Sequence, residues 1–276
     1  MTVPATTHLP SPVSTRCGVV AHRGASAEFP ELTRVAYLQA LEQGAEGLEV
    51  DVRLTSDGVP VLLHDASTAR VADKNLLVHA STLEQVSALD VGSWHPVHRA
   101  PEHVLTLRAF LAMAEAYPQV RLFLETKHPV PSGGRVETAL RDELRYFGLD
   151  RSGSFADSRA VMMSFSVAAV RRFRTLAPDV PTVQLRGRRN VFKSWPAEGC
   201  GAQLMGAGIG LLRTRPWLVE YWRSRGLSTY CWTVDDPADL LLCRDLGVDW
   251  VGTNVPSRAL AVLGGGAPRS KVPAGG

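Results

Sequence analysis

Two carboxylates lie near the end of an apolar stretch of the sequence, and their spacing could hold a metal ion. In GLEVDVR, residues 47–53, a strand would place Glu49, Asp51 and Arg53 on one face and the apolar side chains on the other. Two buried carboxylates this close repel each other and are costly to desolvate unless they are paired. A divalent cation such as Mg²⁺ or Ca²⁺ removes both costs. Taken alone, the motif is better explained by internal arginines that pair with the carboxylates.

A second apolar stretch, RLFLETK at residues 121–127, also ends in charged residues. Its Glu125 adds a third carboxylate, and Lys127 could hold an anion beside it. Taken alone, these two residues would form a surface ion pair at a strand end. Because both stretches carry charge at the end of an apolar run, Glu49, Asp51 and Glu125 together predict a site for a hard divalent cation.

Two histidines occupy similar positions after apolar runs. His22 follows residues 19–21, and His64, with Asp65, follows residues 59–63. His64 could be a metal ligand, a structural histidine or an acid/base group, and a single histidine at a strand end is more often structural. A pair around one metal site could supply a base and an acid together, because imidazole exists in both protonation states near neutral pH. The sequence leaves open which histidine is the base and which the acid.

Strand-length apolar segments alternate with helix-length amphipathic segments along the chain. The expected strands are residues 18–21, 47–53, 120–126, 160–165, 182–185, 202–205, 228–234 and 249–252. The expected helices are residues 33–43, 107–116, 136–146, 167–176, 216–225 and 237–246. The first of them has Thr33 as its N-cap and stops at Gly44. About eight such units predict an α/β fold, a parallel sheet closed into a (β/α)₈ TIM barrel.

The barrel is expected to occupy residues 17–263 as one domain. Residues 66–104 fit no single strand–helix unit and contain one helical pattern, at 83–89, so they predict a small inserted subdomain near the barrel mouth. Residues 1–16, rich in proline, are expected to be a disordered leader. Residues 264–276, rich in glycine, are expected to be a flexible tail.

Composition excludes several classes of function. The net charge is only +3 over 276 residues, without the concentrated basic stripes of a nucleic-acid binder. No segment reaches the roughly 18 apolar residues that cross a membrane, so no stable membrane insertion is expected. The four cysteines have no metal-finger spacing, and the N-terminus has no apolar signal region. These features predict a cytoplasmic protein with reduced thiols.

Four segments together resemble the glycerophosphodiester phosphodiesterase family, whose members are built on a TIM-type barrel with a small inserted subdomain. In chain order they are HRGASAEFPELT, EVDVRLTSDGVPVLLHD, ETK and YCWTVDDPADLLLCRDLGVDWVGTN, and the resemblance runs over residues 22–256. Each fragment alone would be weak evidence. The combination of HRG, E-x-D, HD and E-x-K at these separations is specific.

The resemblance implies a role for each matching residue. The metal ligands would be Glu49, Asp51 and Glu125, the acid/base pair His22 and His64, the cations that neutralise the phosphate Arg23 and Lys127, and the aromatic wall of the substrate pocket Trp232. Glu31 matches the Glu of the family's P-E-N-T motif. The implied cofactor is one divalent cation, Mg²⁺ or Ca²⁺.

Four places depart from the family pattern. Leu32 replaces the Asn of P-E-N-T, Asp235 replaces the Asn that often follows W-T-V, and Asn254 replaces the Asp of the late T-D. The segment before the second helix, usually I-P-T-L, reads VLTL at residues 104–107. None is a proposed ligand or acid/base group, but the substrate pocket and the start of the first helix could differ from those of the family.

The resemblance implies metal-dependent hydrolysis of small glycerophosphodiesters to sn-glycerol 3-phosphate and an alcohol. The attacking group could be the 2-hydroxyl of the glycerol, through a cyclic phosphate, or water. Two alternatives stay open. One is a lysophospholipase D-like activity on lysolipids, with an apolar entry over residues 66–104; the other is a silent barrel that binds phosphodiesters without cleaving them. Head-group preference and oligomeric state are not predicted.

Overall fold

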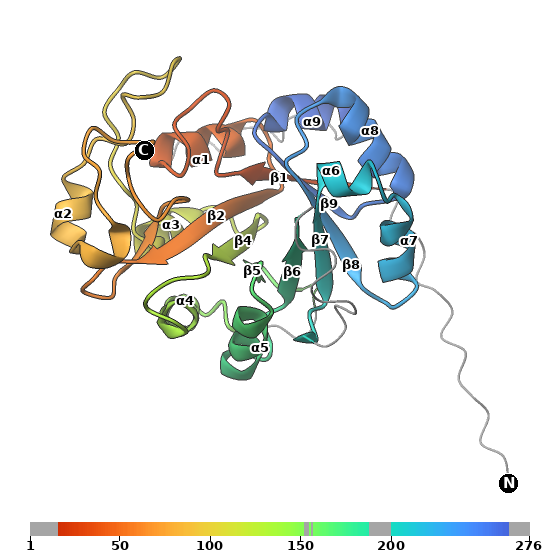
Figure 1. The fold of residues 1–276 in the computed structure, drawn as a ribbon. Coiled ribbons are helices and arrows are strands. Elements are labelled where there is room, and N and C mark those ends of the chain that lie inside the picture. Colours follow the sequence, from red (N-terminus) through yellow and green to blue (C-terminus); the bar gives the residue numbers. More distant parts are fainter. Residues whose placement is uncertain (1–15, 152–154, 156, 188–199, 265–276) are drawn as a thin grey trace, which may run out of the picture.

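Eight parallel strands close into a barrel in the computed structural model, which describes residues 16–151, 155, 157–187 and 200–264 (Figure 1). The strands are β1 (Gly18–His22), β2 (Gly47–Leu54), β4 (Arg121–Thr126), β5 (Ala160–Ser164), β6 (Thr182–Arg186), β7 (Leu204–Gly208), β8 (Ser228–Trp232) and β9 (Trp250–Thr253). They pair in this order, and parallel pairing of β1 with both β9 and β2 closes the ring. The predicted (β/α)₈ barrel is confirmed.

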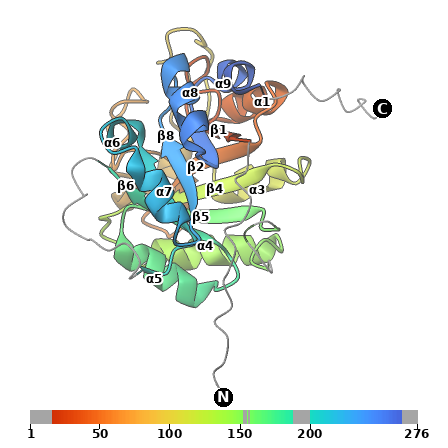
Figure 2. The same cartoon turned by 90° about the vertical axis from the view of Figure 1, so that its right-hand side faces the viewer.

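Helices surround the strands, with α4 and α5 on one side and α1, α8 and α9 on the opposite side (Figure 2). They are α1 (Arg34–Glu42), α3 (Leu107–Ala114), α4 (Arg135–Tyr146), α5 (Val167–Leu176), α6 (Ile209–Leu212), α7 (Trp217–Arg223), α8 (Pro237–Leu246) and α9 (Pro256–Leu263). Side-chain N-caps start four of them, Thr33, Thr106, Ser166 and Asp236. The sequence patterns did not predict α6, which has four residues, or α9, which has eight.

One further strand, β3 (Pro60–Leu62), stands outside the barrel ring. It pairs antiparallel with the end of β2, through Val52 with Leu62 and Leu54 with Pro60. The turn between them contains Gly58, whose φ of 84° lies in the left-handed region that favours glycine. From the carboxyl end of β2 this hairpin leads the chain back along the strand, where the Leu63 N–H donates to the Asp51 carbonyl oxygen at 3.1 Å, and so determines where His64 lies.

Between β3 and α3 the chain forms a small lobe of its own. It contains a 3₁₀ turn (Val78–Ala80) and the helix α2 (Leu83–Ser87), which has a capping box at Thr82. Buried side chains, among them Val71, Val86 and Val104, form a hydrophobic cluster separate from the barrel core. Figure 1 shows this lobe beside β2.

The barrel interior is divided between an apolar floor and a polar mouth. Phe123 and Tyr230 stack at 5.4 Å between ring centroids and fill the floor with Val20, Val161 and Leu204. On the same inward face, Glu49 is level with Phe123 in the strand register, and Asp51 and Glu125 lie one pleat closer to the carboxyl ends. The aromatic floor separates them from water on one side, so their charges act in a medium of low dielectric constant.

Two further expectations concern the chain ends and membranes. The expected leader 1–16 and tail 264–276 lie almost entirely outside the described residues. Among the described residues, no helix has both the length and the apolar character that a membrane crossing requires.

Candidate active site

Three carboxylates meet at the mouth of the barrel. Glu49 and Asp51 lie on β2, and the register places Asp51 directly beside Glu125 of β4. One oxygen of each carboxylate lies within 4.8 Å of the other two, and all three residues are buried. Inward-facing positions on two neighbouring parallel strands therefore form a cluster of hard oxygen donors that could hold a divalent cation.

Two cationic side chains contact this cluster. Lys127 Nζ lies 2.7 Å from Asp51 Oδ1 and 2.9 Å from Glu125 Oε1, and Arg23 Nε lies 2.9 Å from Asp51 Oδ2. Within the described part of the chain, no group donates a hydrogen bond of good geometry to either Asp51 side-chain oxygen, although both oxygens are buried. A buried carboxylate that has cations nearby but no well-formed hydrogen bonds keeps its oxygens available, as a metal ligand requires. The donor set therefore suits Mg²⁺ or Ca²⁺.

The three carboxyl groups differ in their affinity for protons. Burial, reinforced by Asp51, raises the pKa of Glu49 well above its usual range. Burial also raises the pKa of Glu125, to about 7, against the opposing effect of Lys127. Burial alone would raise the pKa of Asp51, but Lys127 and Arg23 outweigh it and hold that pKa below the usual range. Asp51 is thus the carboxylate that stays charged without a metal.

Because a metal must displace the protons of these carboxyl groups, we expect its affinity to depend on pH. Below about pH 7, Glu125 binds a proton in the metal-free protein, so the apparent Mg²⁺ affinity should fall by about tenfold per pH unit for each proton displaced. Calorimetry in buffers of different ionisation enthalpy counts those protons. Glu125→Gln should release fewer of them, and an affinity that stays constant between pH 5.5 and 8 would contradict the assignment.

Arg23 reaches the cluster through an unusual backbone conformation. Its φ is 59°, and its backbone N–H donates to Glu49 Oε2 at 3.1 Å. The next residue, Gly24, has a φ of 87°, and a Cβ there would lie 2.7 Å from Ala36. The glycine therefore lets the chain turn tightly against α1 after β1. This turn places the backbone amide of Arg23 against the Glu49 carboxylate and its guanidinium against the Asp51 carboxylate.

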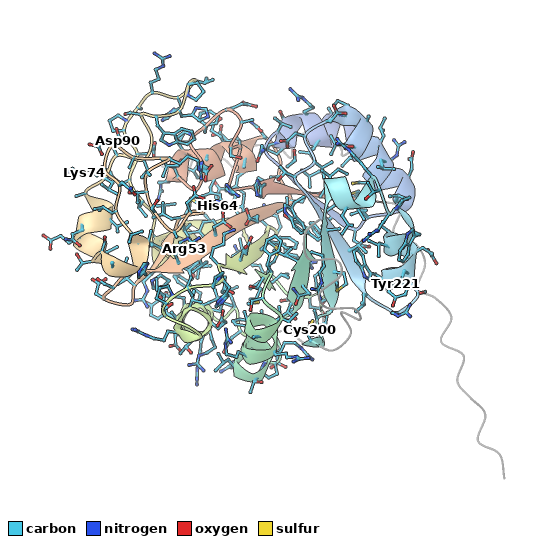
Figure 3. All side chains as sticks on the ribbon, in the orientation of Figure 1. Arg53, His64, Lys74, Asp90, Cys200 and Tyr221 are labelled. Carbon is cyan, nitrogen blue, oxygen red and sulfur yellow. The ribbon has the colours of Figure 1, made fainter. Side chains whose placement is uncertain are left out.

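The two histidines face the cluster from different elements. His22 ends β1, and its Nε2 lies 4.0 Å from Glu49 Oε2. His64 follows β3, and Arg53 donates two hydrogen bonds to its carbonyl oxygen, at 3.0 and 2.7 Å. Figure 3 shows Arg53 and His64 close together, away from Lys74 and Asp90 on the outer lobe. The sequence predicted His64 at a strand end, but not the antiparallel hairpin or the arginine that hold it.

The partner of each imidazole Nδ1 is different. In His22 it lies 2.8 Å from the amide oxygen of Asn254, and in His64 it lies 2.8 Å from the carboxylate of Asp65. Burial, reinforced by Arg23, lowers the pKa of His22 to about 4. Burial also lowers the pKa of His64, but the nearby Asp51 opposes it. Of the two rings, His64 is the better placed to carry a proton.

An ion-pair network joins the outer lobe to the site. Arg70 binds Glu31 through two hydrogen bonds, at 2.8 and 2.7 Å, and donates to Asp65 at 2.6 Å. Glu31 in turn accepts from Arg23 at 3.2 Å. A small hollow beside His64 is lined by these side chains. No pattern in the sequence indicated Arg70, because its partners lie 5 and 39 residues away.

The predicted aromatic wall lies farther around the ring. Trp232 ends β8, two strands from β1, and packs edge-on against Phe165 with 5.5 Å between ring centroids. Its ring also stacks on Tyr230 at 6.0 Å. Trp232 is partly exposed at the end of β8.

Three of the departures from the family pattern can be located in the structure, and two of them are in contact. Leu32 adopts a φ of 60° and is buried, and the next residue, Thr33, still caps α1. Asp235 and Asn254 contact each other: the Asn254 side-chain amide donates to Asp235 Oδ2 at 2.8 Å. The family often has Asn at the first position and Asp at the second, so this chain has the two residue types in reverse order within one hydrogen-bonded pair.

Comparison with known proteins is consistent with this geometry. The model of the "Glycerophosphoryl diester phosphodiesterase family" matches residues 22–258. A Mycobacterium tuberculosis protein named "Probable glycerophosphodiester phosphodiesterase 1" is 43% identical over 251 residues, which is 89% of this chain and 92% of the relative.

Two solved structures share the fold. One, from Silicibacter pomeroyi, has a TM-score of 0.80 at 27% identity, covering 90% of this chain and 95% of that one. The other is an Oleispira antarctica phosphodiesterase in complex with the product sn-glycerol-3-phosphate, with a TM-score of 0.79 at 23% identity, covering 90% and 97%. The match of motifs, barrel and family model shows that this chain belongs to the glycerophosphoryl diester phosphodiesterase family.

Proposed function

We propose that this protein is a divalent-metal-dependent enzyme that hydrolyses glycerophosphodiesters to sn-glycerol 3-phosphate and an alcohol. Membership of the family makes the chain a phosphoric diester hydrolase. The observation that carries the proposal is the buried cluster of Glu49, Asp51 and Glu125, with two cations and a histidine beside it. The product bound in the Oleispira relative supports the choice of substrate.

The metal would be held by the three carboxylates. When bound, it would act as a Lewis acid on a non-bridging phosphate oxygen and offset its charge. The chain itself contributes Arg23 and Lys127, which stabilise the extra negative charge that develops on the phosphoryl group in the transition state. Both are already oriented toward the cluster by their ion pairs with Asp51.

The different partners of the two histidines support different roles. His22 is buried, pairs with a neutral amide and has a lowered pKa, so it is suited to accept the proton of the attacking hydroxyl. His64 pairs with a carboxylate, which stabilises the imidazolium form, so it is suited to protonate the departing alcohol. The attacking oxygen is the glycerol 2-hydroxyl or water, and both routes need the same first proton transfer.

Trp232 would form an apolar wall of the substrate pocket. Its indole ring is partly exposed and is held by packing against Phe165 and Tyr230. Such a ring can pack against the carbon chain of the glycerol or of the leaving alcohol.

A lysophospholipase D-like activity retains one supporting observation. The outer lobe exposes Leu77, Trp94 and Val97, and Val97 is 73% exposed. An acyl chain would need exposed apolar side chains to contact, and the outer lobe, which follows His64 in the chain, provides them.

Identification of the products separates these functions. Purified enzyme with Mg²⁺ or Ca²⁺ is given glycerophosphocholine or lysophosphatidylcholine, and the phosphorus products are identified by ³¹P NMR. We expect glycerol 3-phosphate from the first substrate, at a much higher rate than any lysophosphatidic acid from the second. The reverse order of rates would favour the lipid activity, and binding without any product would favour the silent barrel.

The thiols are the basis on which we propose a cell compartment. All four cysteines are buried and free of disulfides, as a reducing compartment predicts. This supports our proposal that the enzyme acts in the cytoplasm.

A further inference from the structure

A chain of hydrogen bonds runs from His22 to Asp235 through Asn254. His22 Nδ1 lies 2.8 Å from Asn254 Oδ1, and Asn254 Nδ2 donates to Asp235 Oδ2 at 2.8 Å. Asp235 Oδ1 accepts from the backbone N–H of Asn254 at 2.7 Å and from the Thr253 hydroxyl at 2.9 Å. All of these residues lie at or just after the ends of β1, β8 and β9, and of them only His22 approaches the carboxylate cluster.

Asp235 determines which way the Asn254 amide points. An ionised carboxylate only accepts hydrogen bonds, so the Asn254 atom facing Asp235 Oδ2 must be the NH₂ group. Rotating the amide by 180° would place its oxygen against a carboxylate oxygen at hydrogen-bond distance. The amide oxygen therefore faces His22.

The amide oxygen in turn determines where the His22 proton lies. An amide oxygen cannot donate, so His22 Nδ1 must carry the hydrogen, and the neutral ring has its lone pair on Nε2. Nε2 is the atom that faces Glu49, at 4.0 Å. The Ser26 hydroxyl does not decide this, because its single hydrogen lies between two acceptors, His22 O and Asn254 Oδ1, both at 2.8 Å.

We propose that Asp235 and Asn254 are positioning residues that hold His22 in the Nδ1–H tautomer, with the Nε2 lone pair directed into the active site. The inference rests on the proposed function only where it makes Nε2 the atom that accepts the substrate proton. The tautomer itself is a property of the resting protein.

Single substitutions in this pair should disturb the tautomer in a defined way. In Asp235→Asn, two amides face each other. If the new amide at position 235 keeps its oxygen on the Thr253 hydroxyl and the backbone N–H, its NH₂ group faces the NH₂ group of Asn254. Rotation of Asn254 relieves this contact but turns its NH₂ toward His22, which favours the Nε2–H tautomer and removes the lone pair from the site.

Exchanging the two residues should restore the arrangement. In the double variant Asp235→Asn/Asn254→Asp, the new carboxylate at position 254 accepts from His22 Nδ1–H. The new amide at position 235 donates to that carboxylate, and its oxygen accepts from Thr253 and from the backbone N–H. Every hydrogen bond in the described network keeps a donor and an acceptor.

Nitrogen NMR of histidine-labelled protein tests the proposal. The chain has eight histidines, and the His22 signals are assigned by their loss in His22→Gln. We expect the wild-type protein to carry the proton on Nδ1 at neutral pH, Asp235→Asn to shift it toward Nε2, and the exchanged pair to return it to Nδ1. Ser26→Ala is the matched control and should keep the wild-type tautomer.

Kinetics give the second measurement. Asp235→Asn should lower kcat by about 10- to 100-fold, as loss of an outer-shell partner does, with little change in KM. The exchanged pair should recover most of this loss. An Nε2–H tautomer in the wild type, or an unchanged tautomer in Asp235→Asn, would overturn the proposal. If the tautomers behave as expected but His22→Ala is fully active, the positioning stands and the base role fails.

Discussion

His22→Ala is expected to lower kcat by about 10²–10⁴-fold on glycerophosphodiesters with either a poor or a good leaving group, because a base that activates the attacking hydroxyl is needed in both cases. His64→Ala should cause a similar loss on glycerophosphocholine. The loss of kcat in His64→Ala should be much smaller on a glycerophosphoryl ester of 4-nitrophenol, since 4-nitrophenol leaves as the phenolate and needs no proton from an acid.

The two substrates therefore separate the roles of the two histidines. Release of the alcohol is followed rather than release of glycerol 3-phosphate, so that only the first bond cleavage is measured. His79→Ala, at an exposed histidine of the outer lobe, is the matched control and should behave as wild type. Rescue of His22→Ala but not of His64→Ala by the aryl ester would reverse the roles. Near-wild-type turnover of glycerophosphocholine by either variant would remove that histidine from the mechanism.

Asp51→Asn is expected to abolish metal binding and most of the activity. Asp51 contacts both cations and is the carboxylate that stays ionised in the metal-free cluster. Removing the Asp51 carboxylate should weaken Mg²⁺ or Ca²⁺ binding by more than the roughly 10- to 100-fold that follows removal of a residue that only hydrogen-bonds to a metal ligand. Loss of the Lewis acid, worth several kcal/mol, should lower kcat on the order of 10²–10⁴-fold.

Folding is the control for this variant. Lys127 retains Glu125 as a partner and Arg23 retains Glu31, so the fold should survive. Circular dichroism verifies this, and Asp245→Asn removes the same charge from an exposed position near the end of α8. Metal affinity in Asp51→Asn equal to that of Asp245→Asn would show that Asp51 is not a ligand.

The carboxylate cluster could be predicted because strand geometry is local. Alternation along β2 puts Glu49 and Asp51 on one face, and parallel pairing with β4 then brings Glu125 beside Asp51. Neither step depends on loops. The barrel itself could be predicted from the repeated alternation of strand and helix patterns, and the N-cap of α1 from the residue type of Thr33.

The rest of the site depends on contacts between distant segments. His64 is held by a hairpin that pairs antiparallel with β2, and by Arg53 on its carbonyl oxygen. Asp235 and Asn254 lie 19 residues apart and meet only because β8 and β9 end side by side. Both had appeared in the sequence merely as separate departures from a family pattern, and their contact gives those departures a shared physical reason.

The strand predicted at residues 202–205 shows a different limit. The structure has β7 at Leu204–Gly208, two to three residues later. A Cβ at Gly206 would lie 2.6 Å from the Leu185 side chain, so a larger residue at this inward position would force neighbouring side chains to shift. A strand containing two glycines has little apolar signal, because tertiary packing rather than local propensity selects its residues.

The most direct test of the central claim is the release of glycerol 3-phosphate from glycerophosphocholine by metal-stripped enzyme. We predict no turnover after chelation and full recovery when Mg²⁺ or Ca²⁺ is returned, with no recovery in Asp51→Asn. Full activity in protein shown by elemental analysis to be free of metal would contradict a metal-dependent phosphodiesterase.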